Sequence, residues 1–241
     1  MLTERLQQFA ETGLDLLFPP TCAGCSKLGT RWCENCQAKV PKIGLPHCEL
    51  CGLPRRDPGV CQKCVAQPPP YLKMRSWAVF DFPIQNALHS LKYRRNFTLG
   101  TAIADQITEF VMDLQLPVDL IIPVPLGRQR LKQRGYNQVA LVAQPLARRL
   151  NLPYTDQAIT KRLENRSQVG LSIAERQENV KDAYLARQDI VCEKNILLLD
   201  DVATTGATIG SCSQAIMAAG AKGVYAITIA RAISQRDLTR A

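Results

Sequence analysis

The 241-residue sequence has no long apolar run, few aromatic residues and fewer acidic than basic residues. No stretch approaches the ~18 apolar residues that a membrane-spanning helix needs. Glu4, Arg5 and Glu11 interrupt the apolar face of the first residues, which is not typical of a signal peptide. We therefore expect a cytoplasmic protein without a membrane span. Aromatic residues make up only 6%, which argues against the stacking surfaces that commonly bind single-stranded nucleic acids.

The shortage of acidic residues leaves the chain strongly basic. Thirty Lys and Arg residues against 21 Asp and Glu residues give a net charge of +9. No acidic residue lies between Leu120 and Thr155, a stretch that holds six basic ones. Such a balance favours phosphate-bearing partners, small or polymeric, although solvated surface charge has the same composition. A hydrophobic content of 46% is enough for one substantial core and a smaller module.

Cysteine, in contrast, is abundant near the N-terminus, where eight of the ten form four Cys-x-x-Cys pairs. Two such pairs make one tetrahedral Cys₄ site, so four predict two structural zinc ions with no open coordination position. Disulfides or an iron–sulfur cluster are less favoured. We prefer to pair the first unit with the second and the third with the fourth, but the spacing leaves the interleaved arrangement open. The predicted zinc ligands are Cys22, Cys25, Cys33, Cys36, Cys48, Cys51, Cys61 and Cys64.

Composition along the chain suggests four parts. An amphipathic helix is predicted in residues 1–20, where Pro19 and Pro20 stop the apolar periodicity. A double zinc-ribbon module follows in residues 21–66, which are too few to fold without metal. The proline-rich linker Gln67–Pro70 leads into an α/β domain at residues 71–233. A polar tail at residues 234–241 ends the chain.

The most informative stretch runs from Ile196 to Thr208. Four aliphatic residues lead directly into two carboxylates, which predicts a strand buried on both faces of a parallel sheet, with Asp200 and Asp201 at the ligand crevice. Carboxylates accept hydrogen bonds from ribose hydroxyls, and a glycine turn before a helix holds a phosphate. A plain connection with Asp caps is the alternative. The candidate ligand-binding residues are Asp200, Asp201, Ala203, Thr204, Thr205, Gly206, Ala207 and Thr208.

Two further segments carry basic residues. A second buried strand is predicted at Asp119–Ile122, and the basic stretch Leu126–Tyr136 behind it is predicted to be a loop, followed by a helix over Asn137–Leu150. Residues 160–171 are predicted to form a mobile loop, and Ser172 with Glu175 forms a capping box for a short helix. Either basic segment is suited to a phosphate contact or to plain solvation.

The segment Leu197–Thr208 resembles the phosphoribosyl-pyrophosphate signature of type I phosphoribosyltransferases. The resemblance implies an α/β parallel-sheet fold, ribose hydroxyls on the acidic pair, a 5′-phosphate in the following loop, and Mg²⁺ bound together with phosphoribosyl pyrophosphate. It also implies that the loop after the second strand contacts the pyrophosphate. The residues expected there are Val124, Pro125, Arg128, Arg134 and Arg176.

Together with the zinc module, the chain resembles the ComF (ComFC/GntX-like) family. Matching segments include Leu91–Tyr93, Pro123–Leu126 and Arg134–Gln138. This resemblance implies a role in natural competence, the uptake of single-stranded DNA, with a transformation helicase and a recombination mediator as partners. Two alternatives remain open: an active phosphoribosyltransferase with an unknown acceptor, and a ligand-sensing interaction protein whose zinc module docks a partner.

Overall fold

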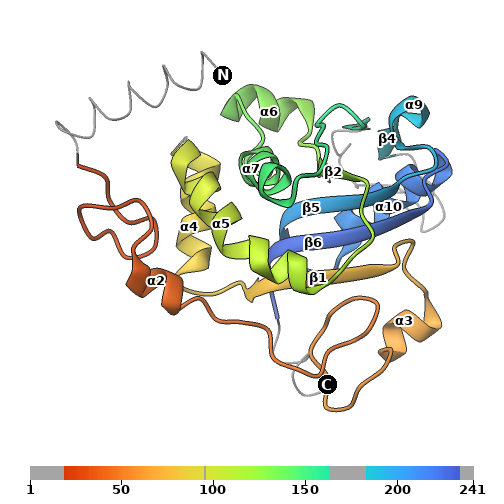
Figure 1. Cartoon of the computed structure of the whole chain (residues 1–241), viewed down its shortest axis with the longest axis horizontal. Coiled ribbons are helices and arrows are strands. Elements are labelled where there is room, and N and C mark those ends of the chain that lie inside the picture. Colours follow the sequence, from red (N-terminus) through yellow and green to blue (C-terminus); the bar gives the residue numbers. More distant parts are fainter. Residues whose placement is uncertain (1–18, 95, 163–182, 234–241) are drawn as a thin grey trace, which may run out of the picture.

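A parallel β-sheet forms the centre of the protein (Figure 1). The computed structural model describes residues 19–94, 96–162 and 183–233, and within these the sheet has four strands in the order β1–β6–β5–β2. All neighbouring strands in it are parallel. A separate antiparallel pair is formed by two three-residue strands. The strands are β1 Lys73–Val79, β2 Leu120–Pro123, β3 Ile159–Lys161, β4 Tyr184–Ala186, β5 Asn195–Ala203 and β6 Gly223–Arg231.

Helices cover both faces of the sheet. The helices α4, α5 and α7 pack on one face, and α10 packs on the other (Figure 1). Three shorter helices lie in the zinc-ribbon region and after β2, and a fourth precedes β5. The bounds are α2 Glu34–Ala38, α3 Gln62–Ala66, α4 Ile84–Tyr93, α5 Phe97–Asp113, α6 Arg128–Arg134, α7 Ala140–Leu150, α9 Gln188–Val191 and α10 Ala207–Ala218.

The strand β5 is buried on both faces, as its uninterrupted apolar run predicts. Ile196 and Leu198 belong to the core under α10, whereas Leu197 and Leu199 belong to the core under α4, α5 and α7. Successive side chains of a strand point to opposite faces, so a strand between two cores needs apolar residues at every position. Both neighbouring strands run parallel to β5, which brings the carboxyl ends of three strands to one edge of the sheet.

The two cysteine clusters lie on opposite faces of this sheet. Cys22 and Cys36 belong to the core that α4 covers, and Cys48, Cys51 and Cys64 belong to the core that α10 covers. The chain between the clusters passes along the edge strand β1, where the Val79 N–H donates to the Pro41 carbonyl over 2.8 Å and residues 42 and 78 form an isolated bridge. We call Pro41 and Lys42 the edge segment.

Several boundaries differ from the prediction. The basic stretch Leu126–Tyr136, expected as a loop, contains α6, which Gly135 ends with a φ of 78°. This helix buries none of its residues, so it has no apolar periodicity to reveal it. Helix α7 begins at Ala140 rather than Asn137, and helix α5 begins at Phe97, where Asn96 caps it by accepting from the Leu99 N–H.

Other expectations fall outside the described residues. These are the N-terminal helix, the capping box at Ser172 and Glu175, the pyrophosphate contact of Arg176, and the polar tail. Among the residues that are described, none of the helices combines the length and apolar character needed to cross a bilayer.

Two glycines make a matched test of helix packing. A Cβ on Gly100 of α5 would lie 2.6 Å from the Leu141 carbonyl oxygen, whereas one on Gly210 of α10 would meet nothing within 4 Å. We expect Gly100→Ala to lower the free energy of unfolding by about 1–3 kcal/mol, because the clash outweighs the better helix propensity. Gly210→Ala should raise it by about 0.5–1 kcal/mol. Chemical denaturation measures both, and an unchanged Gly100→Ala protein would contradict the close packing of α5 on α7.

Candidate functional site

A polar cavity of about 180 Å³ lies at the carboxyl ends of β2 and β5. It collects Asp200, Asp201 and Thr208 together with the β2 end at Val124 and Pro125, so the structure brings these five expected residues to one place. Arg128 is exposed on α6 and does not line the cavity, whereas Arg134 does. The cavity's remaining residues are Lys92, Leu126, Gly127, Arg130, Gln138, Lys161, Tyr184 and Val202.

The carboxylate of Asp201 is the most highly connected group in the cavity. Its Oδ2 lies 2.7 Å from Lys92 Nζ and accepts from Gln138 Nε2 over 3.0 Å. Its Oδ1 accepts from the Val202 N–H over 2.7 Å. Arg134 in turn donates to Gln138 Oε1 over 2.8 Å. A polar chain therefore runs from Arg134 of α6 through Gln138, just before α7, to Asp201 near the end of β5. A ligand hydroxyl must share Asp201 with Lys92 or displace it.

The neighbouring Asp200 is buried, and its pKa is raised. Its Oδ1 accepts from the Asp201 N–H over 2.8 Å, and its side chain is buried. Burial and the nearby Asp201 carboxylate raise its pKa to about 8, against the opposing charge of Lys92. Both causes favour the protonated form of Asp200, because two adjacent buried carboxyls resist ionising together.

The turn after Asp201 connects β5 to α10. Gly206 has a φ of 80°, a conformation that favours glycine, and α10 begins at the next residue. Thr204, Thr205, Ala207 and Thr208 are exposed around this helix start, where N–H groups without intrahelical partners attract anions. Ala203 differs from the other candidates. Its side chain is buried, and its carbonyl accepts from the Ala232 N–H.

Two residues central to this geometry were not among the predicted site residues. Lys92 lies in the last turn of α4, and Gln138 lies just before α7. In the sequence, both residues stand out only as members of the segments Leu91–Tyr93 and Arg134–Gln138 that match the ComF family. Asn137 makes two hydrogen bonds with the backbone: its Oδ1 accepts from the Val139 N–H, and its Nδ2 donates to the Val124 carbonyl. The Arg134–Gln138 segment already marked this neighbourhood, but only the fold brings it to Asp201.

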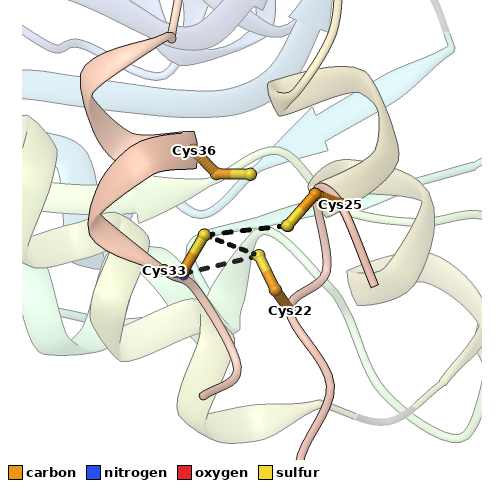
Figure 2. Close-up of side chains that lie close together, drawn as sticks. All are labelled: Cys22, Cys25, Cys33 and Cys36. Atoms are coloured by element: carbon orange, nitrogen blue, oxygen red, sulfur yellow. Dashed lines mark hydrogen bonds between the residues drawn. The ribbon is translucent and has the colours of Figure 1, made fainter. Parts of the chain in front are cut away.

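The eight paired cysteines form two four-thiol clusters, one of which is shown in Figure 2. Within each cluster the four sulfur atoms lie within 4.8 Å of one another. The first unit joins the second and the third joins the fourth, which confirms the preferred sequential pairing over the interleaved one. We call the cluster of Cys22, Cys25, Cys33 and Cys36 the first ribbon site, and that of Cys48, Cys51, Cys61 and Cys64 the second ribbon site.

The two ribbon sites repeat one local structure. In each, the third cysteine N–H donates to the sulfur of the first, from Cys33 to Cys22 over 3.4 Å and from Cys61 to Cys48 over 3.3 Å. In both sites the third cysteine directly precedes a short helix, α2 after Cys33 and α3 after Cys61. Although burial opposes it, these and other backbone N–H groups lower the pKa of both Cys22 and Cys48 to about 6. Each site therefore has a thiolate ready to bind zinc, and the all-sulfur donor set fits a structural ion.

These features define a class: a double zinc-ribbon protein with a parallel-sheet α/β domain. The model of the double zinc ribbon domain matches residues 13–65. Among solved structures, adenine phosphoribosyltransferase from Thermoanaerobacter pseudethanolicus is similar over 63% of this chain and 87% of its own, with 14% identity and a TM-score of 0.38.

Two curated relatives extend over most of the sequence. The DNA utilization protein YhgH of Salmonella typhimurium is 32% identical over 209 residues, covering 83% of this chain and 90% of its own. Competence protein F of Haemophilus influenzae is 30% identical over 213 residues, with the same coverage of both chains. The chain belongs to the ComF family.

The ribbon sites generate a metal prediction. We expect two zinc ions per chain, and one in Cys48→Ser, because a closed Cys₄ site that loses one thiolate loses much of its ~10–16 kcal/mol of binding energy. The melting temperature should fall steeply in the same variant. Native mass spectrometry counts the ions, and Cys192→Ser is the control because Cys192 belongs to neither cluster. Two zinc ions retained in Cys48→Ser would refute the assignment.

The raised pKa of Asp200 generates a stability prediction. A carboxyl whose folded pKa lies near 8 instead of its ordinary 3.8 stabilises the fold below about pH 4, and this contribution is lost as the pH rises to about 8. Asn at this position can still accept from the Asp201 N–H but never ionises. Asp200→Asn should therefore melt above the wild type by about 3 °C or more at pH 8.5, and by less at pH 6, in excess zinc. Calorimetry at the two pH values checks this, and a pH-independent difference would contradict the raised pKa.

Proposed function

We propose that this protein binds phosphoribosyl pyrophosphate or a related ribose 5-phosphate at the carboxyl end of β5. The observation that carries the proposal is that Asp200 and Asp201 share one cavity with Thr208, in the first turn of the helix that Gly206 precedes. The carboxyls are suited to ribose hydroxyls, and the start of α10 is suited to the 5′-phosphate.

The charges around the cavity support a pyrophosphate group as part of that ligand. Lys92, Arg130, Arg134 and Lys161 line it from three elements, α4, α6 and β3. Four cations against two carboxyls leave the cavity positive, which favours a diphosphate. The carboxylate donors also fit Mg²⁺, which would neutralise part of the pyrophosphate charge when bound.

We further propose that the binding activity serves DNA uptake in natural competence. Two observations support this proposal. The chain belongs to the ComF family, and the relatives that match 83% of it are named as a competence protein and a DNA utilization protein. Arg128 and Lys132 are exposed on α6 outside the cavity, where they could contact a polymeric phosphate backbone. The partners implied are single-stranded DNA, a transformation helicase and a recombination mediator.

The cationic lining also favours a second candidate, an active phosphoribosyltransferase. In that reaction the bond from ribose C1 to pyrophosphate breaks, and pyrophosphate leaves with the electron pair. An acceptor N–H or O–H forms the new bond to C1 and gives up its proton. Cations placed beside the leaving group would stabilise its developing charge. Release of pyrophosphate in the presence of a candidate acceptor is the property that distinguishes this function from binding alone.

Asp201→Asn tests the ribose site directly. It removes the charge that holds Lys92 while keeping an oxygen for the Val202 N–H, so the fold should persist. We expect affinity for ribose 5-phosphate and for phosphoribosyl pyrophosphate with Mg²⁺ to fall about tenfold or more in calorimetric titration. The control is Asp113→Asn, which removes an exposed carboxylate at the end of α5. Affinity within about twofold of the wild type would disprove the ribose role of Asp201.

A further inference from the structure

The turn between β5 and α10 has a second cavity on its other side, bounded by the second ribbon site. This cleft of about 280 Å³ is lined by Thr205, Gly206 and Ala207 of the turn, and by Lys63 and Cys64 of α3. Lys63 Nζ lies 3.4 Å from the Thr205 carbonyl oxygen, although the two residues are 142 positions apart. A cation from the ribbon thus lies beside the start of α10.

A second cation lines the same cleft from the sheet. Arg231 ends β6, is only 2% exposed, and donates from NH1 to the Cys51 carbonyl over 2.6 Å. Its buried Nε has no hydrogen-bond partner within the described residues, and none of the carboxylates described there forms an ion pair with it. A buried guanidinium that forms no ion pair with a carboxylate favours an anion beside it.

The position of the ribbon relative to the turn is fixed by contacts with β1. Arg75 donates from NH1 to the Glu49 carbonyl over 3.0 Å and to the Cys48 carbonyl over 3.4 Å. The Met74 N–H donates to the Leu50 carbonyl over 2.7 Å. Lys63 itself lies between the zinc ligands Cys61 and Cys64, so its backbone is held on both sides when zinc is bound.

We propose that the second zinc ribbon forms half of the phosphate site, with Lys63 contacting the phosphate of the bound sugar phosphate and Arg231 stabilising it from behind. This inference rests on the proposed ribose 5-phosphate function. The ribose hydroxyls occupy the cavity of Asp200 and Asp201, the phosphate lies at the start of α10, and the ammonium of Lys63 turns from the Thr205 carbonyl to a phosphate oxygen. A dianionic monoester matches two cations and a helix N-terminus.

A structural explanation of the same cations makes a different prediction. A zinc ion with four thiolates carries a net charge of −2, and Lys63 and Arg231 could serve only to balance it. In that case, removing the Lys63 charge would weaken zinc binding and leave phosphate affinity unchanged. Lys63 is exposed and its substitution should not disturb the fold, whereas Arg231 is buried, so the test uses Lys63.

The experiment titrates ribose 5-phosphate into zinc-loaded wild type, Lys63→Gln, Lys63→Arg and Lys27→Gln, with zinc content measured for each. Lys27 is an exposed lysine beside the first ribbon site, so Lys27→Gln makes the same charge change away from the cleft. We expect Lys63→Gln to lose about tenfold in affinity with two zinc ions retained, Lys63→Arg to recover most of it, and Lys27→Gln to match the wild type. Unchanged affinity in Lys63→Gln would overturn the inference.

Two further arms separate this inference from the proposed function. If Asp201→Asn loses binding but Lys63→Gln does not, the ribose site stands and the ribbon's part in it is refuted. If wild type binds no ribose 5-phosphate, inorganic phosphate is titrated instead, with amide shifts of Gly206 and Gly210 as the readout. Shifts that require Lys63 would retain the phosphate site without the sugar, and their absence would overturn both.

Discussion

Two adjacent carboxyls at the buried end of β5 impose the main constraint on this structure. A carboxyl removed from water must either pair its charge with a cation or hydrogen-bond donors, or lose the charge by protonation. Asp201 is ionically paired with Lys92 and bonded to Gln138, while burial and the neighbouring carboxyl raise the pKa of Asp200. Groups from α4, from α6 and from the segment before α7 therefore meet at Asp201, since Arg134 in turn donates to Gln138.

The same constraint bears on the sugar phosphate that we propose as the ligand. The hydroxyls of a ribose can donate to carboxyl oxygens, so a bound sugar can take over part of the compensation that protein groups now provide. Lys92 and the cavity arginines then become available for phosphate oxygens. Asp201 would then exchange Lys92 for a ligand hydroxyl, and Lys92 would exchange Asp201 for a phosphate oxygen, so that neither charge loses its partner. This exchange favours a ligand that carries both hydrogen-bond donors and negative charge.

Local patterns were sufficient for the parts of the molecule whose interactions are close in sequence. The apolar run of β5 predicts its burial on both faces, and the cysteine spacing predicts two zinc sites, because each rests on residues a few positions apart. Lys92 and Asp201 are separated by more than one hundred residues, and Lys63 meets Thr205 only across the fold. Helix α6 has no buried residue, so no periodicity could distinguish it from a loop. The acid–base state of Asp200 depends on burial that sequence alone does not give.

The edge segment connects the two ribbon sites to the protection of β1 against aggregation. An exposed edge strand offers unpaired backbone groups to other chains, and β1 is such an edge in the described sheet. Pro41 and Lys42 pair with it, and Lys42 Nζ lies 3.5 Å from the centre of the Trp77 ring. The segment is tethered on one side by the first ribbon site and on the other by the second. Loss of zinc would release both tethers, and we expect the strand then to be exposed to pairing with other chains.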